Sequence, residues 1–196
     1  MQSNNFTVFH YKEIDSTQKE IWRRVKNKTI KDKTMIIADI QTAGIGTHGR
    51  TWHTDEENNI AFSTYLEANC KIEDITNLTI NIAKNIVKTF KEMYDINLDI
   101  KYPNDIYHNG KKIGGILTET KVQKGIVKCI VIGIGINTNQ TSFAKEIEKI
   151  ATSIKNEFGI TVKNEDVIPH LGTEIFRGIH IWGRSFFGEL DWLEEN

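Results

Sequence analysis

The 196-residue chain has few prolines, few cysteines and almost no net charge. Two prolines leave no proline-rich linker, so we expect a single domain over residues 1–196. Cys70 and Cys129 stand far apart and outside any zinc-binding spacing, which predicts two reduced thiols packed in or near a core. Lys and Arg total 25 and Asp and Glu total 26, for a net charge of −1. This balance argues against a strongly basic nucleic-acid-binding protein.

Long apolar runs and targeting signals are also absent. No uninterrupted apolar run approaches the roughly 20 residues that a membrane helix needs. Residues 1–5 lack the basic and then apolar pattern of a signal peptide. We therefore expect no membrane partner and a cytoplasmic protein. Hydrophobic residues make up 39% of the chain and charged residues 26%, as in an ordinary globular domain with a full core.

Hydrophobic periodicity predicts an alternation of strands and helices. Strands are expected at residues 6–11, 35–40, 59–66, 98–102, 113–119 and 127–136. Helices are expected at 75–93 and 164–177. A further helix is expected to start at Thr17, which has capping-box spacing to Glu20. Residues 180–196 are interpreted as a short helix against the core.

Two hairpin signals join the predicted strands. Asn109-Gly110 favours a tight turn, and residues 121–125 suit a second one. Strands grouped around hairpins, with helices in separate blocks, predict an α+β fold. Its central sheet should be mixed, largely antiparallel and flanked by helices.

A glycine-rich run, GIGTHGR, extends from Gly44 to Arg50. A dinucleotide-binding site would need this pattern between a strand and a helix, but a polar stretch interpreted as a loop, residues 52–59, follows it. We therefore exclude a nicotinamide site, and the P-loop pattern is absent as well. The run fits either a loop that binds phosphate through backbone N–H groups and Arg50, or a flexible surface turn.

A second motif, KYPND, precedes a lysine at the start of a strand. Pro103 ends the preceding strand and holds Asn104 and Asp105 at its end. Lys112 then opens the strand at 113–119. The ordinary alternatives are a simple Pro-Asn-Asp turn and a solvated lysine beside a hairpin.

Glycines inside the last two predicted strands form a third pattern. Gly114 and Gly115 lie in one strand, which indicates close approach of a ligand or of another backbone. Gly133 and Gly135 alternate with β-branched residues and face the same side, leaving a flat floor for a planar ligand or for a crossing helix. Asn137 ends this strand.

Together, and in this order, these motifs resemble the catalytic domain of biotin protein ligases. The matching segments are DST at 15–17, QTAGIGTHGRTW at 41–52, KYPND at 101–105, KIGGIL at 112–117 and GIGIN at 133–137. The resemblance covers roughly residues 6–159. It implies the class II aminoacyl-tRNA synthetase-like fold of biotin and lipoate ligases. It also implies ATP-dependent formation of biotinyl-5′-adenylate, followed by transfer of biotin to a lysine of a biotin carboxyl carrier protein.

The resemblance also implies roles for individual residues. Three of them, Lys112, Asp105 and Arg50, are expected to be catalytic. The expected biotin-binding residues are Ser16, Thr17, Gln41, Gly44, Lys112, Gly114, Gly115, Gly133 and Gly135. The expected nucleotide-binding residues are Gly46, Thr47, His48, Gly49, Arg50, Trp52, Asn104 and Asn137. Mg²⁺ is expected to arrive with ATP, and no protein metal ligand is predicted.

The sequence departs from the family pattern in its glycine-rich loop. Ile45 and Thr47 stand where the family usually has arginines, which leaves Arg50 as the loop's arginine. A weaker hold on the nucleotide or on the adenylate is expected, unless Arg23 or Lys19 supplies the missing charge.

Two further domains of the family are not expected. Residues before Phe6 leave no room for a helix-turn-helix, and residues after Trp192 leave none for the small C-terminal barrel. No DNA partner is therefore expected, and a homodimer is plausible by analogy only. Two alternatives stay open: a relative that ligates lipoate or octanoate, and a non-catalytic protein that binds biotin.

Overall fold

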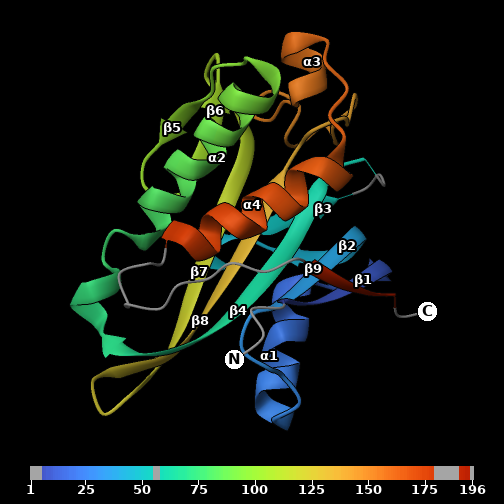
Figure 1. Cartoon of the computed structure of the whole chain (residues 1–196). Helices are drawn as coiled ribbons and strands as arrows, with labels where there is room; N and C mark the ends of the chain where they lie inside the picture. Colours follow the sequence, from blue (N-terminus) through green and yellow to red (C-terminus); the bar gives the residue numbers. More distant parts are fainter. Residues whose placement is uncertain (1–5, 55–57, 179–189, 195–196) are drawn as a thin grey trace.

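The central feature is a mixed β-sheet whose strand order is β5-β6-β7-β8-β4-β2-β1-β9, with β3 paired to β2 (Figure 1). The computed structural model describes residues 6–54, 58–178 and 190–194. The strands are β1 (Phe6–Ile14), β2 (Thr34–Ile45), β3 (Thr51–Thr54), β4 (Ile60–Lys71), β5 (Asp99–Lys101), β6 (Asp105–His108), β7 (Lys111–Gln123), β8 (Ile126–Ile136) and β9 (Leu190–Glu194). The helices are α1 (Thr17–Asn27), α2 (Leu78–Tyr94), α3 (Ile154–Phe158) and α4 (Asn164–Gly178), with 3₁₀ turns η1 (Thr47–Gly49) and η2 (Ile72–Ile75).

The sheet is largely antiparallel because tight hairpins build its central part. Asn109 and Gly110 have φ angles of 48° and 78°, and Lys124 and Gly125 have 52° and 76°. Positive φ at both central residues is the type I′ geometry that matches strand twist. Parallel pairing occurs where β1 meets β2 and β9. The predicted α+β fold with a mixed sheet is confirmed.

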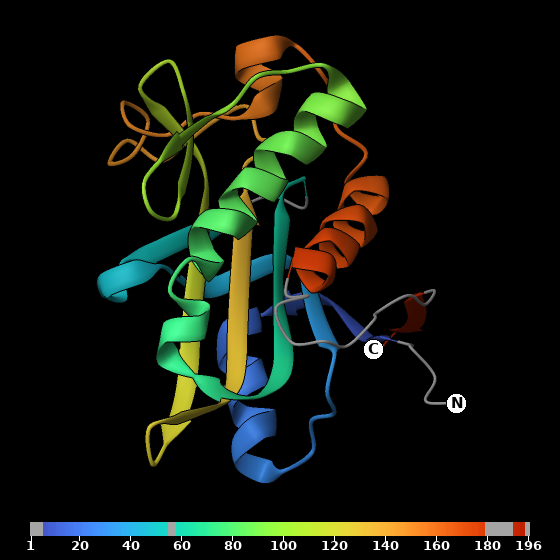
Figure 2. The ribbon, with the colours of Figure 1, turned by 60° about the vertical axis from the view of Figure 1, so that its left-hand side comes forward.

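Helices cover the two faces of the sheet unequally. Figures 1 and 2 show α2 and α4 side by side on one face and α1 on the other. The face under α2 and α4 holds the larger core, which includes Phe90 and Leu171, while Ile21 of α1 belongs to a smaller one. Along β2, Met35 faces the larger core and Ile36 the smaller, as strand alternation requires.

The start of α1 differs from the prediction by one residue. Ser16 is the N-cap, and its hydroxyl accepts a hydrogen bond from the backbone N–H of Lys19 at 3.4 Å. Thr17, predicted to cap the helix, is instead its first residue and is 3% exposed. Its side chain is used in contacts with β2 and β4, so it is not available to cap.

Several other boundaries were wrong. The strand expected to end at residue 40 continues to Ile45, and the expected polar loop contains β3, because Ile45 pairs with Thr51 across a tight connection. The helix expected from residue 75 begins at Leu78, after η2. Strand β6 and helix α3 were not predicted, and both are short. Helix α4 agrees closely with the predicted range 164–177.

The C-terminal expectation of a short helix is wrong for the residues that can be described. Residues 190–194 form β9, which lies parallel to β1 at the edge of the sheet. The rest of the interval 180–196 lies outside the described residues. Among the residues described, no helix is long and apolar enough to cross a membrane.

Candidate functional site

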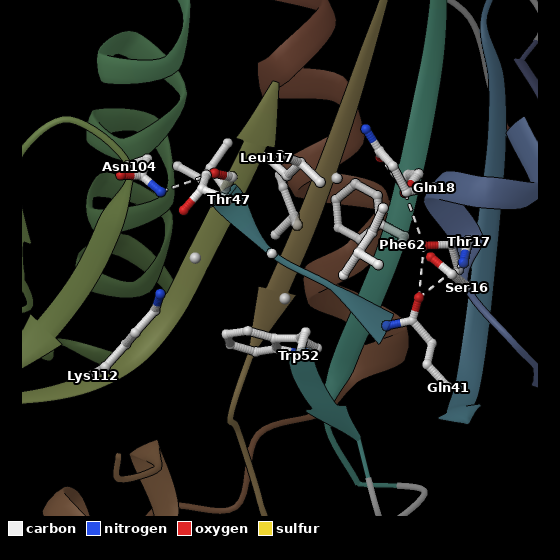
Figure 3. Close-up of a pocket in the computed structure, with 18 residues that line it drawn as sticks. Ser16, Thr17, Gln18, Gln41, Thr47, Trp52, Phe62, Asn104, Lys112 and Leu117 are labelled. Atoms are coloured by element: carbon white, nitrogen blue, oxygen red, sulfur yellow. Dashed lines mark hydrogen bonds between the residues drawn. The ribbon is translucent and has the colours of Figure 1, made fainter. Parts of the chain in front are cut away.

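A pocket opens where the start of α1 meets β2, β4, β7 and β8, and Figure 3 shows its lining. Ser16, Thr17 and Gln41 stand on one side and Lys112 on the other, with Trp52 between them. The empty space in the pocket and its open mouth amounts to about 440 Å³. Its lining from the predicted site comprises Ser16, Thr17, Gln41, Gly46, Thr47, Trp52, Asn104, Lys112, Gly115, Gly133 and Gly135.

One end of this pocket is polar and uncharged. Gln41 Oε1 accepts hydrogen bonds from the Thr17 backbone N–H at 2.9 Å and from the Thr17 hydroxyl at 3.1 Å. The Thr17 hydroxyl also lies 2.8 Å from Ser63 Oγ. Ser16 is 1% exposed. Neutral donors and acceptors of this kind match a neutral polar ligand group such as a urea.

Hydrogen bonds extend from this polar end to residues behind the pocket, and the sequence did not predict them. Ser63 donates to Gln18 Oε1 at 2.9 Å, and both residues line the pocket. Gln18 Nε2 then donates to Glu119 Oε2 at 2.9 Å, and Trp22 Nε1 donates to the same oxygen at 2.7 Å. Gln18 follows directly after Thr17, and that adjacency was the one available signal.

The glycine floor predicted on β8 is present. A Cβ on Gly133 would stand 2.7 Å from Gln18 Oε1, and one on Gly135 would collide with the Trp52 indole. Both positions line the pocket, and their lack of side chains lets Gln18 and Trp52 pack directly against the strand. The Trp52 ring rests on the floor at Gly135. Its Nε1 is buried and has no hydrogen-bond partner among the described residues.

Lys112 lies where the first pocket meets a second one. Its Nζ donates to Asp105 Oδ1 at 2.7 Å and stands 5.7 Å from the centre of the Trp52 ring. Antiparallel pairing of β6 with β7 brings these residues together, with Asp105 opposite Gly115 and Tyr107 opposite Lys112. Both pockets include Lys112, Trp52, Gly46 and Thr47 in their linings. A ligand that spans both pockets would pass beside the lysine.

The second pocket is larger, at about 840 Å³, and has an apolar wall. Arg50 and Asn137, expected to bind the nucleotide, line it together with Asp105, which was expected to be catalytic. The wall was not predicted and consists of Phe143, Ile147, Ile150 and Ala151. Ile150 is 61% exposed. The segment carrying these residues has no regular secondary structure, so no periodic signal marked it.

The glycine-rich loop is a turn between two strands. The Gly46 N–H donates to the Arg50 carbonyl at 2.7 Å, and Gly49 takes a φ of 73°, a conformation that favours glycine. Strand β3 follows instead of the α-helix that a dinucleotide-binding motif requires. The Arg50 side chain is exposed, and no hydrogen bond or ion pair engages it within the described segments.

Four predicted site residues line neither pocket. A Cβ on Gly44 would stand 2.5 Å from the Trp52 carbonyl oxygen, and one on Gly114 would stand 2.9 Å from the Gly135 carbonyl oxygen. Both glycines therefore serve close backbone packing. His48 and Gly49 lie exposed at the tip of the loop. The structure thus does not bring Gly44, Gly114, His48 or Gly49 to the pocket walls.

Neither cation considered as a substitute for the missing loop arginines lines a pocket. Arg23 binds Asp15 through two hydrogen bonds of 2.9 and 2.7 Å and also contacts Glu20 at 2.7 Å. The hydrogen bond from Arg23 lowers the pKa of Asp15 from 3.8 to about 2. Lys19 Nζ donates to the Ala43 carbonyl at 3.3 Å.

The fold and the two joined pockets define an α+β ligand-binding domain, and comparisons with known proteins identify its family. Residues 11–137 match the model of the biotin/lipoate A/B protein ligase family. The chain therefore belongs to this family. The resemblance drawn from the motifs is confirmed at this level.

Individual relatives agree with this assignment. The chain is 37% identical over 166 residues to the Bacillus subtilis bifunctional ligase/repressor BirA, covering 84% of this chain and 51% of that protein. It superposes with a TM-score of 0.74 on a biotin protein ligase from Aquifex aeolicus in complex with biotin and ATP, at 29% identity, covering 92% of this chain and 73% of the other. A Leishmania major biotin protein ligase shares the fold with a TM-score of 0.73 at 23% identity. The chain spans about half the length of the curated relatives it matches.

Proposed function

We propose that this chain is an ATP-dependent biotin protein ligase. It would join biotin to ATP, form biotinyl-5′-adenylate, and transfer biotin to a lysine of a biotin carboxyl carrier protein. The observation that carries the proposal is the meeting of a neutral polar pocket and a larger, partly apolar pocket at Lys112. A relative of the same family binds biotin and ATP together.

The first pocket suits biotin. Ser16, Thr17 and Gln41 offer uncharged donors and acceptors to the ureido group, and they are joined by Gln18 and Ser63. The thiophane ring and valeryl chain would pass beside Gly115, Gly133 and the Trp52 ring that covers Gly135, with Phe62, Ile116 and Leu117 as apolar neighbours. The biotin carboxylate would then reach Lys112.

The second pocket suits the adenylate. Asn137 and the apolar wall at Phe143, Ile147 and Ile150 would receive the base and ribose. The phosphates would meet Lys112 and Arg50, the two cations in its lining. Trp52 would lie at the junction, where it lines both pockets.

Lys112 would act in the first step by offsetting negative charge. A biotin carboxylate oxygen attacks the α-phosphorus of ATP, the bond to the β-phosphate breaks, and pyrophosphate leaves. Charge accumulates on the phosphoryl oxygens during this displacement, and a cation already in place stabilises it. Asp105, 2.7 Å from Lys112 Nζ, holds the ammonium group at this position.

Asp105 would act in the second step on the acceptor. The acceptor lysine attacks the biotinyl carbonyl carbon only as a neutral amine, and AMP leaves. A carboxylate close to the amine can orient it and accept its proton. Asp105 lines the second pocket, where the adenylate would be open to the acceptor.

Mg²⁺ would bind as part of the ATP substrate. Within the described residues, no three His, Cys, Asp or Glu side chains come together to hold a metal ion. Mg²⁺ favours phosphate oxygens and water, so it would enter with the triphosphate.

The remaining expectations stay predictions. They are a single domain, action in the cytoplasm on a carboxylase, a homodimer, and no DNA partner. The free thiols of Cys70 and Cys129 fit a reducing compartment. A lipoate-type ligase is the main competing function, because the matched family model also covers lipoate ligases. The polar, urea-matched end of the first pocket favours biotin.

The test is biotin-dependent exchange of labelled pyrophosphate into ATP, which needs no acceptor protein. We expect exchange in the unmodified chain and its loss, by about 100-fold or more, in Lys112→Ala, because one charged transition-state partner disappears. Lys111→Ala is the matched control, since Lys111 is adjacent on β7 but lines neither pocket. The control should keep the exchange rate.

Two results would contradict this function. Biotin binding without any exchange would favour a non-catalytic biotin-binding protein. Exchange that depends on lipoate and not on biotin would favour the lipoate-type relative.

A further inference from the structure

The apolar wall of the second pocket is attached to the sheet at Lys112. The Lys112 backbone N–H donates to the Ile150 carbonyl at 2.8 Å, and the Thr152 backbone N–H donates to the Lys112 carbonyl at 2.9 Å. These two bonds flank a parallel bridge between Lys112 and Ala151. Strand β7 is itself paired with β6 and β8, so the Lys112 backbone is a fixed point for the end of the wall.

Thr152, the residue directly after the wall, uses all of its polar groups. Besides its N–H bond to Lys112, its carbonyl accepts from Asn137 Nδ2 at 3.1 Å, and its hydroxyl donates to Glu157 Oε1 at 2.7 Å. Its side chain is 2% exposed. A shift of Thr152 would therefore move the wall relative to Lys112 and Asn137, which are both proposed to bind the nucleotide.

The carboxylate of Glu157, in α3, holds the Thr152 side chain in place. An ionised carboxylate can only accept, so the hydroxyl hydrogen of Thr152 is committed to it. Within the described residues, this hydroxyl has no other hydrogen-bond partner. The second oxygen, Glu157 Oε2, accepts from Asn109 Nδ2 at 3.3 Å. Asn109 lies in the turn of the β6–β7 hairpin, so one carboxylate joins the end of the wall to the hairpin that carries Lys112.

We propose that Thr152 and Glu157 are positioning residues that hold the apolar wall where it can receive the base and ribose of ATP. The proposal rests on the proposed function and deepens it. Thr152 and Glu157 line neither pocket, so they act on the ligand through the wall. Without their bond the Thr152 side chain can turn, and Ile150 and Ala151 directly before it lose their fixed placement. ATP would then bind more weakly, while the first pocket would keep its affinity for biotin.

Two other roles of Glu157 predict different outcomes. A purely structural role would lower stability and leave ATP and biotin affinities changed alike or unchanged. A purely electrostatic role would act in the opposite direction, because removal of a negative charge strengthens the binding of a polyphosphate. Only a positioning role weakens ATP and spares biotin.

The experiment is titration calorimetry with ATP and Mg²⁺, and separately with biotin. Glu157→Ala should raise the Kd for ATP by about tenfold, the equivalent of one hydrogen bond, and should change the Kd for biotin by less than about twofold. Thr152→Val, which removes the hydroxyl and keeps the shape, should do the same. Because both variants remove the same bond, the double variant should be no weaker than either one.

Two further variants serve as controls. Glu157→Gln should keep the Kd for ATP, because the amide oxygen still accepts from Thr152. Glu148→Ala removes a carboxylate from the segment that forms the wall, at an exposed side chain that lines neither pocket. It should not weaken ATP binding.

The proposal is overturned if Glu157→Ala binds ATP as tightly as the unmodified chain, if it loses biotin affinity equally, or if Glu157→Gln is as weak as Glu157→Ala. If Glu157→Ala shows no cooperative thermal transition, Thr152→Val decides by the same criteria. Failure of the proposed function is recognised separately, by the absence of biotin-dependent pyrophosphate exchange in an unmodified chain that binds ATP. An unmodified chain that binds no ATP overturns both.

Discussion

The positive charge available to a nucleotide depends on individual residues of the glycine-rich loop. Ile45 lines the first pocket and Thr47 lines both, and neither carries charge. Arg50 lines the second pocket with an exposed side chain. Arg23 is neutralised by Asp15 and Glu20. The proposed nucleotide pocket therefore relies on Lys112 and Arg50.

Restoring an arginine at Ile45 should strengthen the nucleotide complex. A guanidinium that forms a charge-assisted bond to phosphate should raise ATP affinity, or slow adenylate release, by about tenfold at low salt. The gain should shrink as salt is added. Calorimetry with ATP and a chase of the bound adenylate measure the two quantities.

Thr42→Arg is the matched control, since Thr42 is exposed on the same strand and lines neither pocket. It should leave both quantities unchanged. If Ile45→Arg also leaves ATP affinity and adenylate release unchanged, the missing loop arginine does not limit nucleotide binding. The expectation of a weaker hold on the nucleotide is then wrong.

Helix α1 contributes to the site through its first turn, so whatever holds that turn also holds the pocket. Ser16 caps the helix, and Asp15 Oδ1 accepts from the Ser16 backbone N–H at 2.8 Å. Asp15 is itself bound by Arg23 from the next turn of the helix. The pair is partly exposed, with side chains 37% and 47% accessible, so solvent screens part of its energy.

The Asp15–Arg23 pair predicts a specific pH dependence of stability. Because the folded-state pKa of Asp15 is about 2 and its ordinary value is 3.8, the pair stabilises the fold above the ordinary pKa. This contribution is lost as the pH falls through the folded-state pKa. Asp15→Asn should therefore be less stable than the unmodified chain near about pH 6, and the gap should close between about pH 4 and about pH 2.

Urea denaturation at a series of pH values measures this gap. Arg23→Gln should show the same convergence, because it removes the other half of the pair. A stability gap that stays constant down to the folded-state pKa of Asp15 would show that Asp15 acts through its shape and not through its charge.

In the molecule as a whole, the larger hydrophobic core and the proposed active site lie in different parts of the sheet. The larger core lies under α2 and α4, where Phe90, Ile86 and Phe176 are at most 2% exposed. The first pocket opens where α1 begins, and its glycine floor on β8 carries no side chains. Strands β4 and β8 extend through both regions and pair along most of their length. The core under α2 and α4 therefore holds in place the same strands that form the pocket, although the pocket itself buries little apolar surface.

Truncation of the main core should test this division. Phe90→Ala should lower the free energy of unfolding by about 3–5 kcal/mol, because it leaves a cavity between α2 and the sheet. Ile72→Ala, at a side chain that is 52% exposed, should change it by less than about 0.5 kcal/mol. Urea denaturation measures both. Equal effects of the two substitutions would show that α2 does not close the principal core.

The sequence alone predicted the fold class and most elements from local signals, and it predicted most of the first pocket's lining through the resemblance of its motifs to biotin protein ligases. Turn residues such as Asn109-Gly110 set hairpins, periodicity set α2 and α4, and glycines on β8 set a side-chain-free floor. Boundaries failed where pairing across the sheet overrode local character, as in β3 and β9.

The tertiary structure alone decided what completes the site. Ser63 and the wall at Phe143 and Ile150 carry no local signature and reach the pockets only because distant strands and an irregular segment converge there. Glu119 lines neither pocket and contacts the first one through Gln18. Gly44 and Gly114 belong to the same motifs as pocket residues, yet close backbone contacts use them for packing. The hydrogen-bonded side chains from Glu119 to Thr17 come from β7, β4 and α1, and only the folded sheet brings them together.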